Sequence, residues 1–146
     1  MKIAIGSDHA GPIHKAELIK WLESMGHEVI DKGTDSNDSV DYPDFAYEVA
    51  DSVAQGRAEK GIIICGSGIG VSITANKVEG IRAALVYNEE TAQLARQHND
   101  ANVMCYGARF FSVEDAKKMV SAFFNTDFEG GRHQRRVDKI HDLTGC

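Results

Sequence analysis

The sequence lacks long hydrophobic runs and is poor in cysteine. No apolar run approaches the roughly 20 residues that a membrane-spanning helix requires, and the first residues, MKIAIGSD, predict a strand rather than a signal or transit peptide. Three widely spaced cysteines, Cys65, Cys105 and Cys146, argue against a disulfide framework. We therefore expect a cytoplasmic protein with reduced thiols and no membrane association.

An excess of positive charge is also absent. The formal net charge is −6, which weighs against nucleic acid as a partner because phosphate backbones favour basic surfaces. The segment GGRHQRRVDK departs from this pattern, since it holds Arg132, Arg135, Arg136 and Lys139. Arg132 and Arg136 are four residues apart and would share one side of a helix, a spacing that can clamp a phosphate. The alternative is an ordinary solvated helix face.

The familiar metal and nucleotide motifs are missing as well. The six histidines are scattered, and no Cys or His pair has the CxxC or HExxH spacing of metal ligands, so we expect no metal. The run GIIICGSGIG at 61–70 has Val71 where a dinucleotide loop needs glycine and a C-x5-R phosphatase loop needs arginine. It also lacks the Gly-Lys-Ser/Thr ending of a Walker loop. Three common functions of glycine-rich loops are thereby excluded.

The order of apolar and amphipathic segments predicts the fold class. At 146 residues the chain is large enough for a single domain, residues 1–146, with a substantial core. Short apolar runs alternate with amphipathic segments, which is typical of βαβ units. We expect strands at 2–6, 28–31, 61–65, 81–86 and 101–106, with helices between them. The prediction is an α/β fold, a three-layer α/β/α sandwich around a five-stranded parallel, Rossmann-like sheet of order 2-1-3-4-5.

The most informative stretch follows the third expected strand. Cys65 is succeeded by glycines at 66, 68 and 70, which allow amide N–H groups to converge on an anion just before a helix expected from about Val71. A thiol at a strand end that faces a helix start is more acidic and more reactive than usual. We therefore expect a reactive cysteine beside an anion site; the alternatives are a tight turn and a buried structural cysteine.

Two further pairs of residues are candidates for acid–base or binding roles. If strands one and three are neighbours, Asp8 and His9 lie beside Cys65 at the switch point of the sheet, where ligands bind. Asp8 could instead cap the following helix. His98 and Asn99, in the run ARQHND, suit a helix C-terminus equally well, the histidine through the dipole and the asparagine as a left-handed stop.

Eight motifs follow one another along nearly the whole chain. They are SDHAG near the N-terminus, DYPDFA at 41–46, CGSGIG at 65–70, ANK at 75–77, GIRAA at 80–84, RQHNDANV at 96–103, GAR at 107–109 and EGGRHQRRV at 129–137. In content, order and spacing this set resembles the ribose-5-phosphate isomerase B family, part of a wider family that includes galactose-6-phosphate isomerase.

The resemblance implies catalytic roles for four residues. Cys65 would be the base that moves a proton between C1 and C2 of the open-chain sugar; some relatives use a glutamate instead, so Cys65 implies the cysteine subgroup. His98 would be the acid that opens the furanose ring, with assistance from Asp8. Ser67 stands where several relatives have threonine and would supply a hydroxyl beside Cys65.

The resemblance also implies a set of residues that contact the substrate, a sugar phosphate. The phosphate would be held by His9, Arg132 and Arg136. Further contacts would come from Tyr42, Gly66, Gly68, Ile69, Gly70, Asn99 and Arg109. The family further implies a homodimer, sometimes paired into a tetramer, with each active site built across the subunit boundary and a C-terminal helical arm, residues 127–146, packing on the partner.

The implied reaction interconverts D-ribose 5-phosphate and D-ribulose 5-phosphate through a cis-enediolate. It needs no cofactor, because general acid–base groups and oxyanion donors account for each step. Three other functions stay open. One is an isomerase of a six-carbon sugar phosphate, allose 6-phosphate or galactose 6-phosphate. Another is a sugar-phosphate-binding module, in which a reactive Cys65 would have no purpose. The last is a thiol redox sensor, for which the sequence shows no nearby resolving cysteine.

Overall fold

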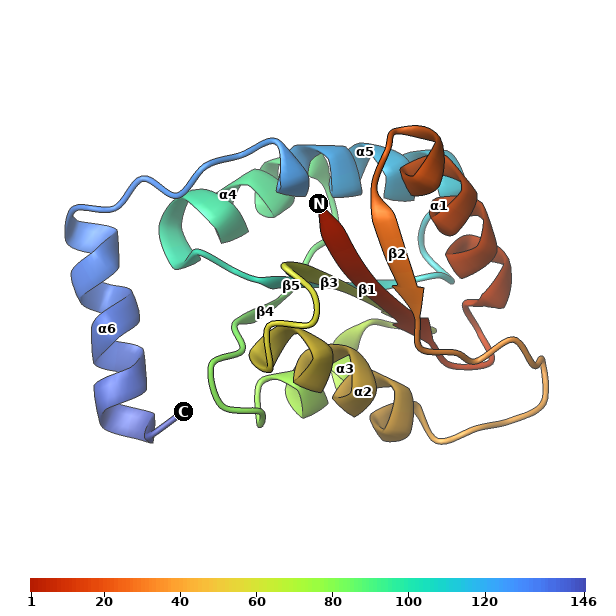
Figure 1. Cartoon of the computed structure of the whole chain (residues 1–146), viewed down its shortest axis with the longest axis horizontal. Helices are drawn as coiled ribbons and strands as arrows, with labels where there is room; N and C mark the ends of the chain where they lie inside the picture. The colour runs from red at the N-terminus through yellow and green to blue at the C-terminus, as the bar shows by residue number, and fades with distance from the viewer.

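A computed structural model describes all 146 residues, in which five strands alternate with five helices and a sixth helix follows (Figure 1). The strands are β1 (Lys2–Ser7), β2 (Glu28–Asp31), β3 (Lys60–Cys65), β4 (Ala83–Leu85) and β5 (Val103–Gly107). The helices are α1 (Pro12–Ser24), α2 (Tyr42–Ala54), α3 (Ile69–Ala75), α4 (Glu89–Asn99), α5 (Val113–Phe124) and α6 (Arg132–Thr144). No helix is both long and apolar enough to cross a membrane.

The strands form one parallel sheet in the order β2-β1-β3-β5-β4. The predicted class, a parallel α/β sheet, is confirmed, but the predicted order 2-1-3-4-5 is wrong in its last two strands. All five residues of β5 are buried, whereas β4 is only three residues long and its last residue, Leu85, is exposed. The wholly apolar strand takes the interior position beside β3 because burial on both faces stabilises it most.

Helices cover both faces of the sheet (Figure 1). Side chains from α1, α4 and α5 pack on one face, against alternate residues of β1, β3 and β5 such as Ile5, Ile64 and Tyr106. Side chains from α2 and α3 pack on the other face, which includes Ile63 and Cys65. This alternation is the two-residue period of a strand buried on both sides, and it directs Cys65 toward the layer that contains α2 and α3.

Local signals set the helix boundaries. Pro12 occupies the first turn of α1, and Gly26 follows that helix with a φ of 87°. Helix α3 begins at Ile69, directly after Gly68 in the left-handed conformation, and therefore slightly before the expected start near Val71. Helix α4 begins with a capping box at Asn88 and ends at Asn99, which places His98 in its last turn.

Helix α6 stands apart from the layered body. In Figure 1 it lies beyond the edge of the sheet, at the end of a long connection from α5, and its axis does not follow the other helices. Within α6 only His133 and Val137 are buried. The predicted helical arm is therefore present as a helix that projects from the rest of the chain.

Candidate active site

The loop that follows β3 closes around the sulfur of Cys65. The backbone N–H of Gly68 donates a hydrogen bond to Cys65 Sγ over 3.0 Å, and the residue is only 4% exposed. Gly68 has a φ of 79°, and a Cβ at this position would lie 2.7 Å from the carbonyl carbon of Tyr106. Only glycine fits this turn, because a side chain would meet both a strained backbone and the neighbouring strand. The loop thus fixes the sulfur and aims a partial positive charge at it.

Asp8 and His9 lie beside the end of β3, as predicted from the switch point. The N–H of Asp8 donates to the carbonyl of Ile64 over 3.1 Å. The buried Asp8 carboxylate also accepts from the N–H of Ala10 over 2.9 Å, so it stabilises the turn before α1, although the N-cap position itself is Gly11. His9 Nδ1 accepts from the N–H of Val40 over 3.2 Å. Because Nδ1 accepts, the proton of neutral His9 resides on Nε2, where it can be donated to an anion.

Arg109 and Tyr42 lie against glycines of the same loop. A Cβ at Gly66 would lie 2.9 Å from Cζ of Arg109, so the guanidinium rests directly on the loop backbone. A Cβ at Gly70 would lie 2.7 Å from the hydroxyl oxygen of Tyr42, the first residue of α2. Arg109 reaches this place because β5 pairs with β3 in a register that sets Cys65 opposite Gly107. The predicted strand order did not place β5 beside β3, so it did not predict this contact.

Two other residues of this loop, Ser67 and Ile69, also lie where a ligand could contact them. Ser67 Oγ accepts from the N–H of Ile69 over 3.3 Å, and Ile69 itself is exposed. The structure therefore gathers one group of predicted site residues at the carboxyl edge of the sheet. This group, which we call the thiol cluster, consists of Asp8, His9, Tyr42, Cys65, Gly66, Ser67, Gly68, Ile69, Gly70 and Arg109.

The other predicted residues lie at the opposite edge of the sheet. Helix α4 runs back from the carboxyl edge, so its last turn, with His98 and Asn99, reaches the amino edge of the strands. Arg82, just before β4, confirms this position, since its Nε donates to the carbonyl of Asn99 over 3.0 Å. The five residues of β5 separate the two edges by about 16 Å. Within one chain, His98 and Asn99 are not brought to Cys65.

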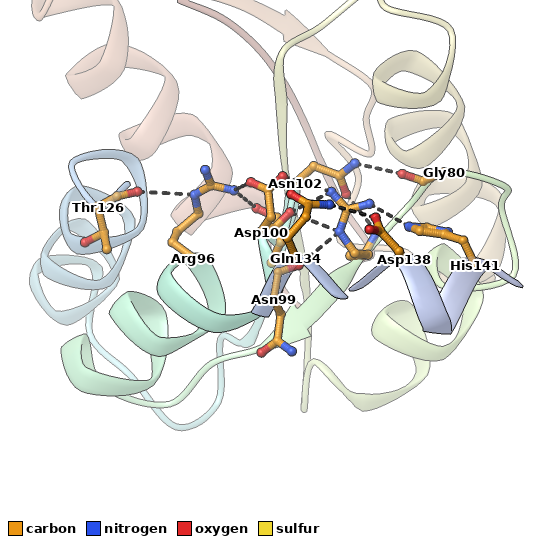
Figure 2. A network of polar contacts seen from close by, with 11 residues as sticks. Gly80, Arg96, Asn99, Asp100, Asn102, Thr126, Gln134, Asp138 and His141 are labelled. Carbon is orange, nitrogen blue, oxygen red and sulfur yellow. Dashed lines mark hydrogen bonds and ion pairs between the residues drawn. The ribbon is translucent and has the colours of Figure 1, made fainter. Parts of the chain in front are cut away.

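A polar network holds the end of α4 to α6 (Figure 2). Asp100 accepts from Arg96 over 2.7 Å and from Arg82 over 3.3 Å, and Arg82 Nη1 lies 3.0 Å from Nε2 of His141 in α6. The left-handed stop of α4 falls on Asp100, with a φ of 44°, and not on Asn99. Figure 2 shows the Asn99 side chain pointing away from the network, so its amide is available to a ligand.

His98 packs against His133, a residue for which the sequence predicted no role. The rings of His98 and His133 are stacked, with centroids 4.3 Å apart and planes 10° from parallel. Burial lowers the pKa of His133, and the positive charge of His98 and Arg132 lowers this pKa further. Arg132 and Arg136 are exposed on the same helix. The only sequence signal for His133 was its place between these arginines in the motif EGGRHQRRV. His98, Asn99, Arg132, His133 and Arg136 together form what we call the arm cluster.

The surface clefts of the single chain lie away from Cys65. The largest, about 680 Å³, lies between β4 and α6 and is lined among others by Arg82, Asn99 and His141. None of the chain's three clefts is lined by Cys65. Cys105 is fully buried in β5, and burial raises the pKa of its thiol, as expected for a structural cysteine.

Comparison with known proteins places these features in a family. Residues 3–140 match the family model described as Ribose/Galactose Isomerase. The chain is 51% identical to ribose-5-phosphate isomerase B of Escherichia coli over 139 residues, which cover 95% of this chain and 93% of that protein.

Two solved structures share the whole fold. Ribose-5-phosphate isomerase B of Clostridium thermocellum superposes with a TM-score of 0.97 at 48% identity, covering 99% of this chain and 98% of the other. The enzyme of Mycoplasma genitalium, determined with bound ribulose-5-phosphate, superposes with a TM-score of 0.95 at 46% identity, covering 99% and 96%. This chain therefore belongs to the ribose/galactose isomerase family and, within it, to the ribose-5-phosphate isomerase B group.

Proposed function

We propose that this chain catalyses the interconversion of D-ribose 5-phosphate and D-ribulose 5-phosphate, with residues 1–146 acting as one isomerase domain. The observation that carries the proposal is the thiol cluster, in which a backbone donor fixes the Cys65 sulfur beside a histidine and an arginine suited to a phosphate. The substrate class follows from the relatives, which are named for this reaction, one of them with ribulose-5-phosphate bound.

The proton transfer uses Cys65 as the base. The deprotonated sulfur removes the proton from C2 of the open-chain aldose, and the electrons of that C–H bond form the C1–C2 double bond of a cis-enediolate. The negative charge gathers on the oxygen at C1, where the Ser67 hydroxyl and those loop N–H groups that are not bonded to Cys65 Sγ or Ser67 Oγ can donate to it. Such preorganised donors contribute roughly 3–4 kcal/mol each. Cys65 then returns the proton to C1 while the proton of the C2 hydroxyl passes to the oxygen at C1, which leaves a hydroxyl at C1 and a carbonyl at C2.

Ring opening and phosphate binding use the arm cluster as well. His98 protonates the ring oxygen, and Asp8 accepts the proton of the anomeric hydroxyl, as the general acid and base of this step. His9 and Arg109 hold the phosphate from one side and Arg132 and Arg136 from the other. Binding energy from the phosphate fixes the reacting carbons against Cys65.

The separation of the two clusters supports an active site that is shared between two copies of the chain. A general acid must come within hydrogen-bond distance of the atom that it protonates, yet His98 and Cys65 lie at opposite edges of one sheet. We therefore propose a homodimer, alone or paired into a tetramer, in which the thiol cluster of one protomer meets the arm cluster of its partner. The projecting arm, residues 127–146, packs on that partner.

The first experiment measures turnover of ribose 5-phosphate by the purified protein in EDTA. Wild type is expected to be active, and Cys65→Ala to lose activity by at least about a hundredfold, since a general base contributes about 10²–10⁴-fold. Cys146→Ala, a thiol at the chain end, is the matched control and keeps wild-type turnover. Near-normal activity of Cys65→Ala would remove the proposed base, and activity on six-carbon but not five-carbon phosphates would overturn the substrate assignment.

A second experiment tests the shared site by mixing two inactive variants. Cys65→Ala and His98→Asn are unfolded together at equal concentration and refolded. If sites are shared, each mixed dimer contains one wild-type site, so activity returns to about a quarter of the wild-type value. If Cys65 and His98 served the same chain, no mixed dimer would contain an intact site, and the mixture would stay inactive.

A further inference from the structure

Three potential metal ligands converge where α6 meets the end of α4. His98 comes from the last turn of α4, Glu129 from the connection before α6 and His133 from the first turn of α6. One ligand atom of each lies within 4.8 Å of the others. Their sequence spacing gave no sign of a metal site, because His98 lies more than thirty residues from its two companions. Only the folded chain brings the three side chains together.

Backbone contacts hold this cluster in place. The N–H of Glu129 donates to the carbonyl of Gln97 over 3.1 Å, which fixes the connection beside the last turn of α4. The N–H of His133 donates to the carbonyl of Gly130 over 3.0 Å and starts α6 at this point. The three side chains are thus anchored by adjoining backbone segments and need only side-chain rotation to approach one another.

His133 carries an unsatisfied ligand atom aimed into the cluster. Its Nε2 is buried and has no hydrogen-bond partner, and the residue is 5% exposed. Glu129 Oε2 lies 3.4 Å away without forming a hydrogen bond. A buried polar atom without a partner is uncommon and costs free energy.

We propose that His98, Glu129 and His133 form a binding site for one Zn²⁺ per chain, with a water molecule in the fourth position. Two histidines and one carboxylate are a donor set that Zn²⁺ takes in sites with an open position. Imidazole ligands favour Zn²⁺ over Mg²⁺ or Ca²⁺, which prefer oxygen. The charges of Arg132 and Arg136 oppose a cation here, and Glu129 offsets part of that repulsion.

The site forms after the His98 ring turns out of its stack on His133, because the two rings lie 10° from parallel and an imidazole binds a metal in its own ring plane. Ligand atoms of a tetrahedral Zn²⁺ site with bonds near 2.05 Å are about 3.3 Å apart, so the largest separation here shortens by about 1.5 Å. The Glu129 side chain is half exposed and can rotate by that amount. The buried His133 ring then serves as the fixed ligand, and the other two side chains move toward it.

Zinc at this site inhibits the isomerase. This consequence rests on the proposed function, because it follows from the role of His98 as the ring-opening acid. A ring nitrogen bound to Zn²⁺ cannot carry the proton that His98 must deliver, and the metal holds the ring against His133 and away from a partner's substrate. Inhibition is reversed by EDTA, which removes the metal.

Binding is tested first, without any need for activity. The Cys65→Ala protein is used as the parent, so that the reactive thiol takes no metal, and Zn²⁺ affinity is measured by titration calorimetry. Tetrahedral Co²⁺ absorption gives a second readout of the same ligands. Glu129→Gln and His133→Asn are each expected to weaken Zn²⁺ binding at least tenfold. Glu28→Gln, an exposed carboxylate in β2, is the control and leaves it unchanged. Unchanged affinity in both cluster variants overturns the site.

Inhibition is tested second, with Cys65 intact. Glu129→Gln is expected to keep wild-type turnover in EDTA and to require at least tenfold more Zn²⁺ for half inhibition. If Zn²⁺ binds at the cluster but leaves turnover unchanged, the inhibitory consequence is overturned while the binding site stands. Absence of isomerase activity in EDTA would count against the proposed function alone, because the binding measurement does not depend on it.

Discussion

Replacing Gly68 with alanine tests both the packing of the glycine loop and its part in catalysis. The N–H of Gly68 donates to Cys65 Sγ, so a shift of this residue moves the donor away from the sulfur. A Cβ here would lie 2.6 Å from Cδ1 of Leu85 and 2.7 Å from the carbonyl carbon of Tyr106. The Leu85 side chain can rotate, but the backbone of Tyr106 belongs to the interior strand β5, which is hydrogen-bonded on both sides, and cannot move without a large cost.

Two costs add up in the Gly68→Ala protein. Alanine in the left-handed conformation costs about 1–2 kcal/mol, and forcing extra volume into a packed site costs about 1–3 kcal/mol. We therefore expect a loss of about 2–5 kcal/mol in the free energy of unfolding. Gly26→Ala is the matched control, since Gly26 also has a positive φ, 87°, but a Cβ there would meet nothing within 4 Å. Its loss is expected to be about 1–2 kcal/mol, from the backbone conformation alone.

The assay is urea unfolding of both variants at one fixed protein concentration, because dissociation of a dimer would make the midpoint concentration-dependent. We also expect kcat of Gly68→Ala to fall about a hundredfold, as displacement of a catalytic group by about 1 Å costs that much. Gly26→Ala is expected to keep wild-type kcat. Equal losses of stability in the two variants would refute the steric argument, and an unchanged kcat in Gly68→Ala would refute the role of the loop.

Three further predictions concern other parts of the molecule. Arg136→Ala is expected to raise KM at least tenfold with little change in kcat, because it removes a phosphate contact; an unchanged KM in initial-rate assays would remove Arg136 from the phosphate site. Lys15→Met is expected to lower the free energy of unfolding by only about 1–2 kcal/mol, since the buried amine, 2.6 Å from both Asp31 and Asp35, leaves behind two carboxylates that water still reaches. A loss in urea unfolding above about 4 kcal/mol would contradict this. Burial lowers the pKa of both His133 and His14 in the folded protein. The unfolded chain therefore binds more protons than the folded chain at acidic pH, so the free energy of unfolding is highest above about pH 6.5 and falls as the pH drops below this value. Urea midpoints at pH 7.5 and 5.5 check this sign, and His133→Asn is expected to reduce the difference.

Short-range sequence patterns predicted much of the architecture. The apolar run at 62–64 lies in one of the predicted strands, and Pro12 and Gly26 are residue types typical of the start and end of a helix. Each of these signals depends only on neighbouring residues. The position of Asp8 beside β3 also followed, since consecutive βαβ units place the ends of adjacent parallel strands together. These features depend only on the two-residue period of a strand, the geometry of a turn and a rule of topology.

The spatial order of the strands and the separation of the site were decided by tertiary structure. The hydrophobic pattern of a segment indicates whether a strand is buried but not which strand takes the interior position and which the edge, so the prediction exchanged β4 and β5. The position of β5 beside β3 explains why Arg109 meets the glycine loop. The motif that contains His98 was recognised in the sequence, yet the direction of α4 places His98 at the edge of the sheet opposite Cys65. The stacking of His98 on His133 likewise arises only where α6 docks, because contacts between distant segments depend on packing rather than on spacing along the chain.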